Sequence, residues 1–444
     1  MANFREIMNR AKAISASVEA PVVQVPELEW SEEQQELLDC LNESRDSLFL
    51  TGNAGTGKST LLNHWLKGQG SSVVIVAPTG IAALNVGGVT IHSLFGLPAE
   101  ALSPLDVAEY LTPRTADKLK QVRTLLIDEV SMVRIDVFAV MNRMLQFAKG
   151  NKLPFGGVRM ILVGDLMQLP PVVKQGAEAE HLAALGSASG WFFNSEAYRD
   201  LNPRRFFLTQ GFRQKDPEFY ALLNRVRAGD RGVAGKINSM VQMSHKAPIS
   251  TLQICSTNNA CDMINDRQFN LLTGEKATYG GTITGKFPEK QVPVPIEHNL
   301  GVGARIMTLK NGSGYVNGSL GVVTELHDKH VVVELDRGGI VQVGDAEWPA
   351  MDYAMTGGKL EKSTKGTYRQ LPVKLAWAMT IHKSQGQGFD SAVVDLGRGA
   401  FAHGQAYVAL SRLRTLEGMY FSRPLKPSDI IVDREVLAFF EEEG

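Results

Sequence analysis

The chain has 444 residues, 44% of them hydrophobic and 21% charged, which is enough for about two to four globular domains. This composition excludes a disordered chain, and 43 glycines, 19 prolines and 3 cysteines exclude collagen and a disulfide scaffold. The 46 basic and 47 acidic residues nearly cancel, so a nucleic-acid site, if there is one, must be a local groove.

The first thirty residues contain basic and acidic side chains but no long apolar core, which excludes a secretory signal. They predict an N-terminal helix followed by a loop at residues 21–26. No apolar run reaches the roughly 18 residues that a membrane helix needs. Three cysteines indicate a reducing compartment, so we expect a cytoplasmic protein without membrane contact.

From about residue 30 to residue 208, short apolar runs alternate with helical stretches. This alternation predicts a parallel sheet with helices on both faces. The expected strands are Ser47–Thr51, Val73–Ala77, Thr124–Ile127 and Met160–Val163. A proline-rich stretch at residues 96–116 interrupts the pattern and is expected to form a small pin.

A second α/β pattern follows, with strands expected at Leu252–Ser256, Lys374–Ala378, Ser391–Leu396 and Met419–Phe421. Between residues 299 and 371 the pattern changes to alternating segments with hairpin turns such as Asn317-Gly318, which predicts an inserted β-barrel. The expected boundaries are 1–45 for an N-terminal helical segment, 46–95 and 117–207 for the first α/β domain, 96–116 for the pin, 208–298 and 372–444 for the second α/β domain, and 299–371 for the barrel.

Residues 52–59 fit the phosphate-binding loop G-x-x-x-x-G-K-[ST], and the loop follows a predicted strand and precedes a predicted helix. In this motif backbone N–H groups surround the phosphates at the positive end of the helix. Lys58 should reach the β- and γ-phosphates, and the hydroxyl of Ser59 should ligate Mg²⁺. The predicted nucleotide-binding residues of the loop are Gly52, Ala54, Gly55, Thr56, Gly57, Lys58, Ser59 and Thr60.

Two further strands end in polar residues that complete a hydrolytic site. Asp128 is suited to Mg²⁺ and Glu129 to polarising the attacking water, while Gln168 follows Gly164-Asp165 at a position to sense the γ-phosphate. No Asn-Lys-x-Asp or Leu-Ser-Gly-Gly motif is present, which disfavours a switch GTPase and an ABC-type ATPase. Arg213 and Arg412 of the second domain could stabilise charge on the transferred phosphoryl group across a domain cleft.

Taken together, these segments resemble the superfamily 1 helicases. The segments that carry the resemblance are Gln34, residues 52–59, 77–80, 90–93, 128–132, 164–172, Arg213, residues 380–386 and the segment ending at Arg412. Gln168-Leu-Pro-Pro-Val, Pro154-Phe-Gly-Gly and His382-Lys-Ser-Gln-Gly are similar to the PIF (petite integration frequency) family, a RecD-related family of branch 1B. Gly388, Leu166 and Met167 depart from its usual pattern.

The resemblance implies two RecA-like parallel-sheet motor domains in tandem and an ATP-dependent DNA helicase that moves 5′ to 3′ on single-stranded DNA. It also implies that Gln34 contacts adenine and that Gly386 belongs to the nucleotide site. By analogy with the family, tailed or forked duplexes, quadruplexes and RNA–DNA hybrids are candidate substrates, and replication, repair and telomere maintenance are candidate roles. We further expect a monomer associated with a bacterial nucleoid.

Single-stranded DNA without sequence preference is held by phosphate contacts and base stacking. The candidate DNA-binding residues are Pro78, Thr79, Gly80, Thr90, His92, Phe95, Asn258, His382, Lys383 and Ser384. Leu97 and Pro98 are expected to form the apolar tip of a strand-separating wedge. Two alternatives stay open: a DNA-stimulated ATPase that remodels DNA–protein complexes without unwinding, and a nucleotide-dependent DNA-binding module that is not a motor.

Overall fold

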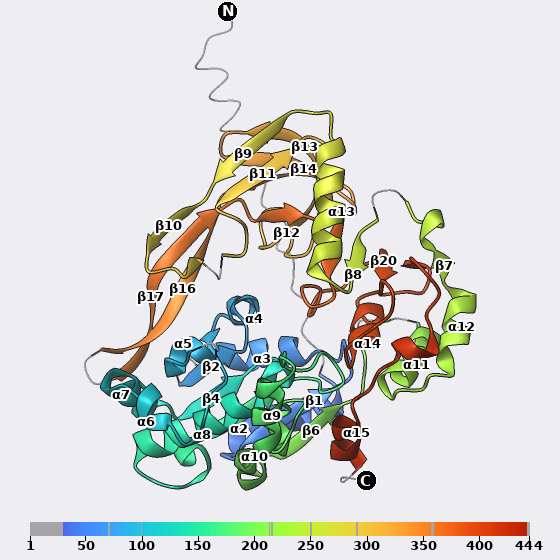
Figure 1. Cartoon of the computed structure of the whole chain (residues 1–444). Coiled ribbons are helices and arrows are strands. Elements are labelled where there is room, and N and C mark those ends of the chain that lie inside the picture. Colours follow the sequence, from blue (N-terminus) through green and yellow to red (C-terminus); the bar gives the residue numbers. More distant parts are fainter. Residues whose placement is uncertain are drawn as a thin grey trace, which may run out of the picture.

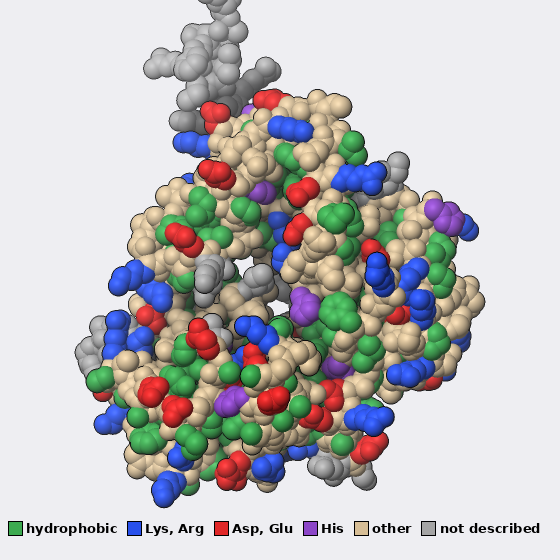
Figure 2. Space-filling view, viewed as in Figure 1, with side chains coloured by type: hydrophobic (Ala, Val, Ile, Leu, Met, Phe, Trp, Pro, Cys, Tyr) green, Lys and Arg blue, Asp and Glu red, His purple; other side chains and the backbone are tan. Residues whose placement is uncertain are grey.

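We analysed a computed structural model that describes residues 30–69, 72–98, 100–212, 214, 216–248, 251–289, 292–356 and 359–441. Two parallel sheets and a region of antiparallel strands are arranged around an open centre, which is hollow in the space-filling view (Figure 1 and Figure 2). The N-terminal helix and the loop at 21–26 that the sequence predicted lie outside the described residues. In the part of the chain that the structure describes, no helix has the length and apolarity to cross a membrane.

The first sheet has six strands in the order β3-β2-β4-β5-β1-β6, and every neighbouring pair is parallel. Its strands are β1 (Leu48–Gly52), β2 (Val73–Ala77), β3 (Val89–Thr90), β4 (Thr124–Ile127), β5 (Arg159–Val163) and β6 (Arg204–Leu208). Sequence analysis found four of them and missed β3 and β6. The first has only two residues, and the second begins with two arginines, so neither shows the apolar run of a buried strand.

Helices cover both faces of this sheet, which explains why its central strands are apolar on both sides. Leu48 and Leu50 pack against α2 (Glu32–Glu43) and α3 (Lys58–Lys67) on one face. Phe49, between them in the strand, points to the opposite face, which α8 (Ile135–Lys149) covers. The other helices of this domain are α4 (Gly80–Asn85), α5 (Ile91–Phe95), α6 (Val107–Tyr110), α7 (Pro113–Gln121), α9 (Ala177–Ala184) and α10 (Glu196–Leu201).

The segment predicted to form a pin is a packed part of the first domain. Leu97, Leu102 and Val107 are buried in its main hydrophobic core. Leu97 therefore cannot belong to the exposed tip of a wedge, so the prediction was wrong for this residue, whereas Pro98 is exposed. Leu105, in the turn between Leu102 and Val107, is instead 88% exposed.

The second parallel sheet has the strand order β19-β8-β20-β21-β7. Its strands are β7 (Gln242–Met243), β8 (Gln253–Cys255), β19 (Ala378–Thr380), β20 (Ala392–Asp395) and β21 (Met419–Phe421), and its helices are α11 (Pro217–Arg227), α12 (Val233–Met240), α13 (Asn258–Leu271) and α14 (Gln405–Leu410). The strand expected at Lys374–Ala378 does not exist as one element. Its first part belongs to an antiparallel strand that ends at Leu375, and the parallel strand begins only at Ala378.

The antiparallel region begins at Lys276, earlier than the predicted boundary at residue 299. In the described residues its strands form three sheets rather than a single barrel. The turn at residues 336–339 connects β14 and β15, which pair antiparallel as a hairpin. The strands are β9 (Lys276–Gly280), β10 (Thr282–Gly285), β11 (Glu297–Gly301), β12 (Arg305–Thr308), β13 (Leu320–His327), β14 (His330–Leu335), β15 (Ile340–Gly344), β16 (Ala346–Thr356), β17 (Lys359–Gln370) and β18 (Val373–Leu375).

The long hairpin of β16 and β17 extends from this region to the first domain (Figure 1). The buried hydroxyl of Tyr353 accepts a hydrogen bond from the backbone N–H of Ile75 at 3.0 Å, and Lys118 pairs with Asp352 at 3.0 Å. These contacts complete the ring of elements around the open centre.

The C-terminal helix α15 (Arg434–Glu441) also joins the two domains. It follows the second sheet in sequence, but Phe439 packs on the rings of Phe49, Phe193 and Tyr198 in the first domain. The predicted assignment of residues 372–444 to the second domain therefore does not describe the packing of this helix.

Candidate nucleotide site and nucleic-acid channel

The topology of the first sheet gathers the predicted nucleotide-site segments at one edge. Strands β4, β5 and β1 are immediate neighbours and run parallel, so their carboxyl ends meet. The phosphate loop follows β1, Asp128-Glu129 follows β4, and Gly164-Asp165 follows β5. Ligands of open parallel sheets bind outside such ends, so the fold places the predicted chemistry together.

The phosphate loop turns sharply from β1 into α3, and its residues from Gly52 to Thr60 lie together as predicted. Gly55 and Gly57 both have φ of 80°, a left-handed conformation that glycine adopts without strain. The ammonium group of Lys58 donates hydrogen bonds to the carbonyl oxygens of Gly52 and Asn53, each at 2.9 Å. Lys58 is therefore folded back onto its own loop and must turn outward to reach a phosphate.

Gln34 lies directly beside this loop, as the resemblance implied. It is buried in α2, where it forms a reciprocal capping box with Ser31. Its Nε2 also donates to the carbonyl of Thr56 at 3.1 Å. The amide thus ties the start of α2 to the loop, while contact with adenine stays a prediction.

Two adjacent carboxylates face the cavity next to the loop. Burial, followed by the neighbouring charge of Asp128, raises the pKa of Glu129, and burial also raises the pKa of Asp128. Ser59 lines the same cavity as both carboxyl groups. The raised pKa values mean that nearby positive charge does not fully offset the cost of ionising these carboxyl groups. A hydroxyl beside two such carboxylates fits a hard cation such as Mg²⁺, and Ser59 and Asp128 are the residues that would hold it.

The third segment forms a turn around Asp165, whose side chain is fully buried. Its Oδ1 accepts from the backbone N–H of Met167 at 3.1 Å, and its Oδ2 accepts from Nε2 of Gln168 at 3.4 Å. The side-chain oxygen of Gln168 lies 3.5 Å from Nε2 of Gln385, in the second domain. The turn therefore places Gln168 at the junction of the two domains.

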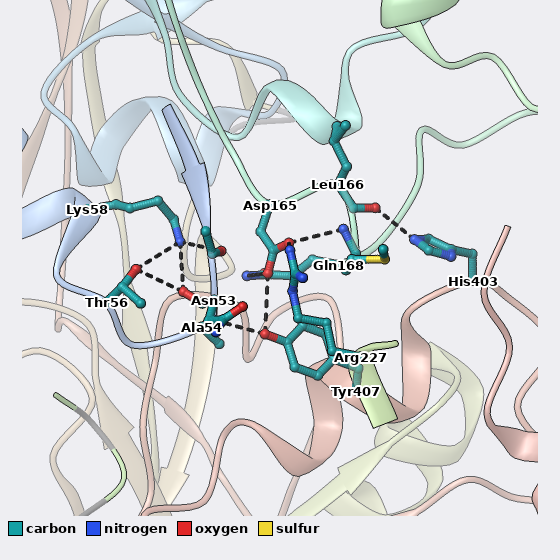
Figure 3. Close-up of polar contacts among 12 residues, drawn as sticks. Asn53, Ala54, Thr56, Lys58, Asp165, Leu166, Gln168, Arg227, His403 and Tyr407 are labelled. Atoms are coloured by element: carbon teal, nitrogen blue, oxygen red, sulfur yellow. Dashed lines mark hydrogen bonds and ion pairs between the residues drawn. The ribbon is translucent and has the colours of Figure 1, made fainter. Parts of the chain in front are cut away.

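Two tyrosines of the second domain reach the phosphate loop, and Figure 3 shows one of them, Tyr407. The hydroxyl of Tyr407, on α14, accepts from the backbone N–H of Ala54 at 2.9 Å and lies 3.3 Å from Oδ2 of Asp165. The hydroxyl of Tyr220, on α11, accepts from the side-chain amide of Asn53 at 2.8 Å. A loop that binds phosphate is thus held by the neighbouring domain at two points.

Arg227 and His403 add two more contacts across the junction (Figure 3). Arg227 pairs with Asp165 at 3.0 Å, and this pairing and the charge of Lys58 outweigh burial and lower the pKa of Asp165. Nδ1 of His403 accepts from the N–H of Asp433, so its Nε2 carries the proton and donates to the carbonyl of Leu166 at 2.8 Å. Burial lowers the pKa of His403, consistent with a neutral ring.

The structure places Arg412 near Glu129. The positive charge of Arg412 opposes part of the rise in the pKa of Glu129, but the Arg412 side chain is almost completely buried. Arg412 donates to the carbonyl oxygens of Val408, Ser384 and Gln387, all in its own domain. In this conformation Arg412 stabilises the loop that also contains Gly386. Gly386 lines the same cavity as Ser59. The other predicted arginine, Arg213, lies outside the described residues.

A cavity of about 840 Å³ lies between the two parallel-sheet domains and the antiparallel region. The space-filling view shows the molecule hollowed at this place (Figure 2). Among the predicted DNA-binding residues, Thr79, His382 and Lys383 line it. Lys374 also lines it, and burial followed by the charge of Lys383 lowers its pKa to about 8.

The remaining DNA-binding candidates separate into three groups. Gly80 and Thr90 line a small hollow beneath the β16–β17 hairpin. Asn258 is exposed at the end of β8, next to the end of β19, and Pro78 and His92 are half-buried beside the first sheet. Two predictions were wrong in this conformation: Phe95 is fully buried in the core, and the buried hydroxyl of Ser384 donates to Ile381, so neither side chain is available to DNA.

Sequence reasoning missed Tyr407, Tyr220, Arg227, Gln385 and Lys374. Tyr407 and Gln385 lie inside segments that the motif analysis had singled out, so their positions carried a signal. Arg227 and Tyr220 lie on an ordinary amphipathic helix, and only the docking of the two domains shows what they contact.

Tandem parallel-sheet domains, with a phosphate loop in one and its contacts supplied by the other, define a RecA-like P-loop NTPase core. A sequence model of the family described as PIF1-like helicase matches residues 29–234. The chain is 32% identical over 435 residues to ATP-dependent DNA helicase Pif1 of Bdellovibrio bacteriovorus, covering 95% of this chain and 94% of that protein. The chain belongs to the PIF1-like helicase family.

The rat protein named ATP-dependent DNA helicase PIF1 is 34% identical over 427 residues, which cover 92% of this chain but 63% of the rat sequence. Unliganded Pif1 from Bacteroides has a TM-score of 0.84 at 35% identity and covers 94% of this chain and 98% of that one. Bacteroides Pif1 bound to ssDNA, also 35% identical, covers 94% of this chain and 97% of that chain at a TM-score of 0.66. The arrangement described above is thus more similar to the unliganded structure, and to the Bacteroides Pif1 complex with ADP-AlF4 at a TM-score of 0.85, than to the ssDNA-bound structure.

Proposed function

We propose that this chain is an ATP-dependent DNA helicase, which hydrolyses ATP at the domain junction and moves 5′ to 3′ along single-stranded DNA. One observation carries the proposal: the second domain contacts the phosphate loop itself, through Tyr407 at Ala54 and Tyr220 at Asn53. Phosphates bind to the backbone N–H groups of such loops, so a bound nucleotide would lie against residues that the second domain contacts. Nucleotide binding and domain position are therefore physically linked, as a motor requires.

In this proposal Lys58 and the loop N–H groups hold the phosphates, and Glu129 polarises the attacking water. Glu129 is suited to this role because it is half-buried at the end of β4, next to the phosphate loop, and lines the cavity. Mg²⁺, held by Ser59 and Asp128, would neutralise charge on the phosphates. Gln168 would sense the γ-phosphate, and Arg412 with Arg213 would stabilise the charge that develops during transfer.

The central cavity is the proposed path of single-stranded DNA. Thr79 of the first domain and His382 and Lys383 of the second line it from opposite sides, so both domains can hold one strand. Alternate gripping by two domains during opening and closing would convert hydrolysis into steps. The relatives' names and the ssDNA-bound Bacteroides structure support this substrate class.

The test is ATP-driven unwinding of two matched duplexes, one with a 5′ tail and one with a 3′ tail, with Lys58→Ala as the blank. Opening of only the 5′-tailed duplex is expected. Opening of only the 3′-tailed duplex would overturn the proposed direction. If neither duplex opened while single-stranded DNA still stimulated ATP hydrolysis, the translocase that remodels DNA–protein complexes would replace the helicase.

The same assay extends to the finer substrates that the family resemblance suggested. Forked duplexes, quadruplexes and RNA–DNA hybrids with identical 5′ tails can be compared at equal enzyme concentration. A monomeric motor should show an unwinding rate per enzyme that does not change with enzyme concentration under single-turnover conditions. A rate per enzyme that rises with concentration would contradict the monomer.

A further inference from the structure

Helix α11 of the second domain contacts the first domain at two places. Tyr220 and Arg227 are seven residues apart, about two helical turns, so they lie on one face of the helix. Tyr220 accepts a hydrogen bond from Asn53 in the phosphate loop at 2.8 Å. Arg227 donates to Asp165, in the turn that carries Gln168, at 3.0 Å. A single face of α11 therefore contacts both the phosphate loop and the turn expected to sense the γ-phosphate.

The pairing of Arg227 with Asp165 is buried, which is unusual for a contact between domains. The side chains are 11% and 0% exposed, and the rings of Phe207 and Phe440 lie 5.2 and 5.7 Å from the guanidinium carbon. Within the described residues, Nε of Arg227 finds no hydrogen-bond acceptor. Removing charges from water is unfavourable unless they are paired, and here Asp165, followed by the hydroxyl of Tyr407, stabilises the charge of the arginine.

Asp165 in turn determines the shape of the turn. It accepts from the N–H of Met167 through Oδ1 and from the side chain of Gln168 through Oδ2, and its carbonyl accepts from the N–H of Gln168 at 3.0 Å. A shift of Asp165 would therefore move Gln168. The ion pair with Arg227 therefore links the second domain to Gln168 through Asp165, beside the hydrogen bond of Tyr407 to Asp165 and the direct contact of Gln385.

We propose that Arg227 is a positioning residue for ATP hydrolysis, which holds Asp165 and so places Gln168 correctly only while α11 is docked on the first domain. This inference rests on the proposed function, because Gln168 acts on bound nucleotide. Arg227 itself touches no phosphate in this role. It differs from Arg213 and Arg412, which are expected to act on the transferred group.

The test compares Arg227→Met with Arg225→Met, a change on the same helix. Arg225 is 48% exposed and pairs with the surface residue Asp230, so its loss should leave turnover unchanged. With saturating single-stranded DNA, Arg227→Met should lower kcat by about 10- to 100-fold, the range seen when a group that orients a catalytic ligand is removed. KM for ATP should stay within about twofold, because the phosphate loop is intact. Arg227→Lys should recover part of kcat.

A double-mutant cycle separates positioning from a general loss of stability. If Arg227 acts through Asp165, Arg227→Met combined with Asp165→Asn should have a kcat no lower than the worse of the two single variants. Arg227→Met alone leaves the buried carboxylate of Asp165 without its ion-pair partner, whereas the double variant has no charge at either position. The kcat of the double variant can therefore be measured even if Arg227→Met alone fails to fold. Effects on kcat that multiply would show that Arg227 acts by another route and would overturn the proposal.

The outcomes also separate this inference from the proposed function. If neither the unaltered protein nor Arg225→Met shows ATP hydrolysis stimulated by single-stranded DNA, the proposed function fails. If both show it and Arg227→Met turns over ATP equally fast, only the positioning role fails.

Discussion

The hydroxyl of Tyr407, in the second domain, accepts a hydrogen bond from the backbone N–H of Ala54, in the phosphate loop of the first, at 2.9 Å. The same hydroxyl lies 3.3 Å from the carboxylate of Asp165. Backbone N–H groups of such loops are the groups that bind phosphate. A contact between domains therefore occupies a backbone donor of the loop that is predicted to bind the phosphates, and we expect the two interactions to compete.

This competition predicts the effect of Tyr407→Phe. The variant keeps the ring but loses the bond to Ala54, so a nucleotide no longer has to displace it. A net hydrogen bond is worth about 0.5–1.5 kcal/mol, so ADP should bind about two- to tenfold more tightly. Isothermal titration calorimetry with Mg-ADP measures this change.

Tyr420→Phe, in strand β21 of the same domain, is the control and should leave ADP affinity unchanged. Weaker binding of ADP to Tyr407→Phe would show that the hydroxyl supports the nucleotide-binding form of the loop instead of competing with it.

We expect Lys374 to make the proposed binding of DNA depend on pH. It lines the central cavity, and burial together with the charge of Lys383 lowers its pKa to about 8. A DNA phosphate binds the protonated amine, so binding should take up a proton and weaken as the pH rises from 7 to 9. Fluorescence anisotropy with a labelled single strand, at constant ionic strength, measures this dependence.

Two substitutions check the assignment to Lys374. Lys374→Arg stays charged over this range, so the affinity of the variant should lose most of its pH dependence. Lys374→Gln should bind about tenfold more weakly at pH 7, as expected for one lost charged hydrogen bond. An unchanged pH dependence in Lys374→Arg would exclude Lys374 as its source.

Leu105 replaces Leu97 as the candidate strand-separating tip. It is 88% exposed in a turn whose flanking residues Leu102 and Val107 are buried, so the tip is both apolar and firmly held. Leu105→Ser should lower the unwinding rate several-fold and leave DNA-stimulated ATP hydrolysis within about twofold, because the core is untouched. Deleting residues 97–116, in contrast, would remove core side chains and destabilise the domain.

The matched control is Leu153→Ser, which changes another exposed leucine of the first domain. A duplex-unwinding assay run beside an ATPase assay on the same preparations distinguishes the two effects. Equal unwinding by Leu105→Ser and the unaltered protein would remove this turn from the list of wedge candidates.

The first sheet could be predicted from sequence where its strands were buried on both faces, since Val73–Ala77 and Thr124–Ile127 are continuous apolar runs. Strand β6 could not be predicted, because it lies at the sheet edge and begins with Arg204 and Arg205, which interrupt the apolar pattern of a strand. The prediction of one strand at Lys374–Ala378 was wrong for a different reason. Two strands of two different sheets meet there, and apolar character does not show where the chain passes from one to the other.

The nucleotide site was predictable because each motif follows its own strand, and parallel strands bring their carboxyl ends together. The contacts of Arg227 and Tyr220 were not predictable, because they depend on how the two domains dock. The local sequence pattern contains no information about that docking. Phe95 was misassigned for a related reason. It lies beside a predicted DNA-binding loop in sequence, but α5 turns its ring into the core.

Gly404 sets how closely the two domains approach. It has φ of 68°, and a Cβ atom added there would lie 2.4 Å from the carbonyl oxygen of Gln168 and 2.5 Å from that of Met167. Gly404→Ala must therefore push α14 away from the turn that carries Gln168. Backbone strain and overpacking each cost about 1–3 kcal/mol, so we expect a lower thermal midpoint.

The same displacement should separate Tyr407 from Ala54 and Gln385 from Gln168, since both contacts cross this boundary. DNA-stimulated ATP hydrolysis should fall by at least about tenfold as the second domain loses its position at the nucleotide. Gly399→Ala is the control, because the nearest atom to an added Cβ there is Asp429 Oδ1 at an ordinary 3.6 Å. If Gly404→Ala kept both its thermal midpoint and its turnover, the domains would not work in the close contact described here. A loss of turnover with a preserved midpoint would instead place the effect of Gly404 at the junction itself.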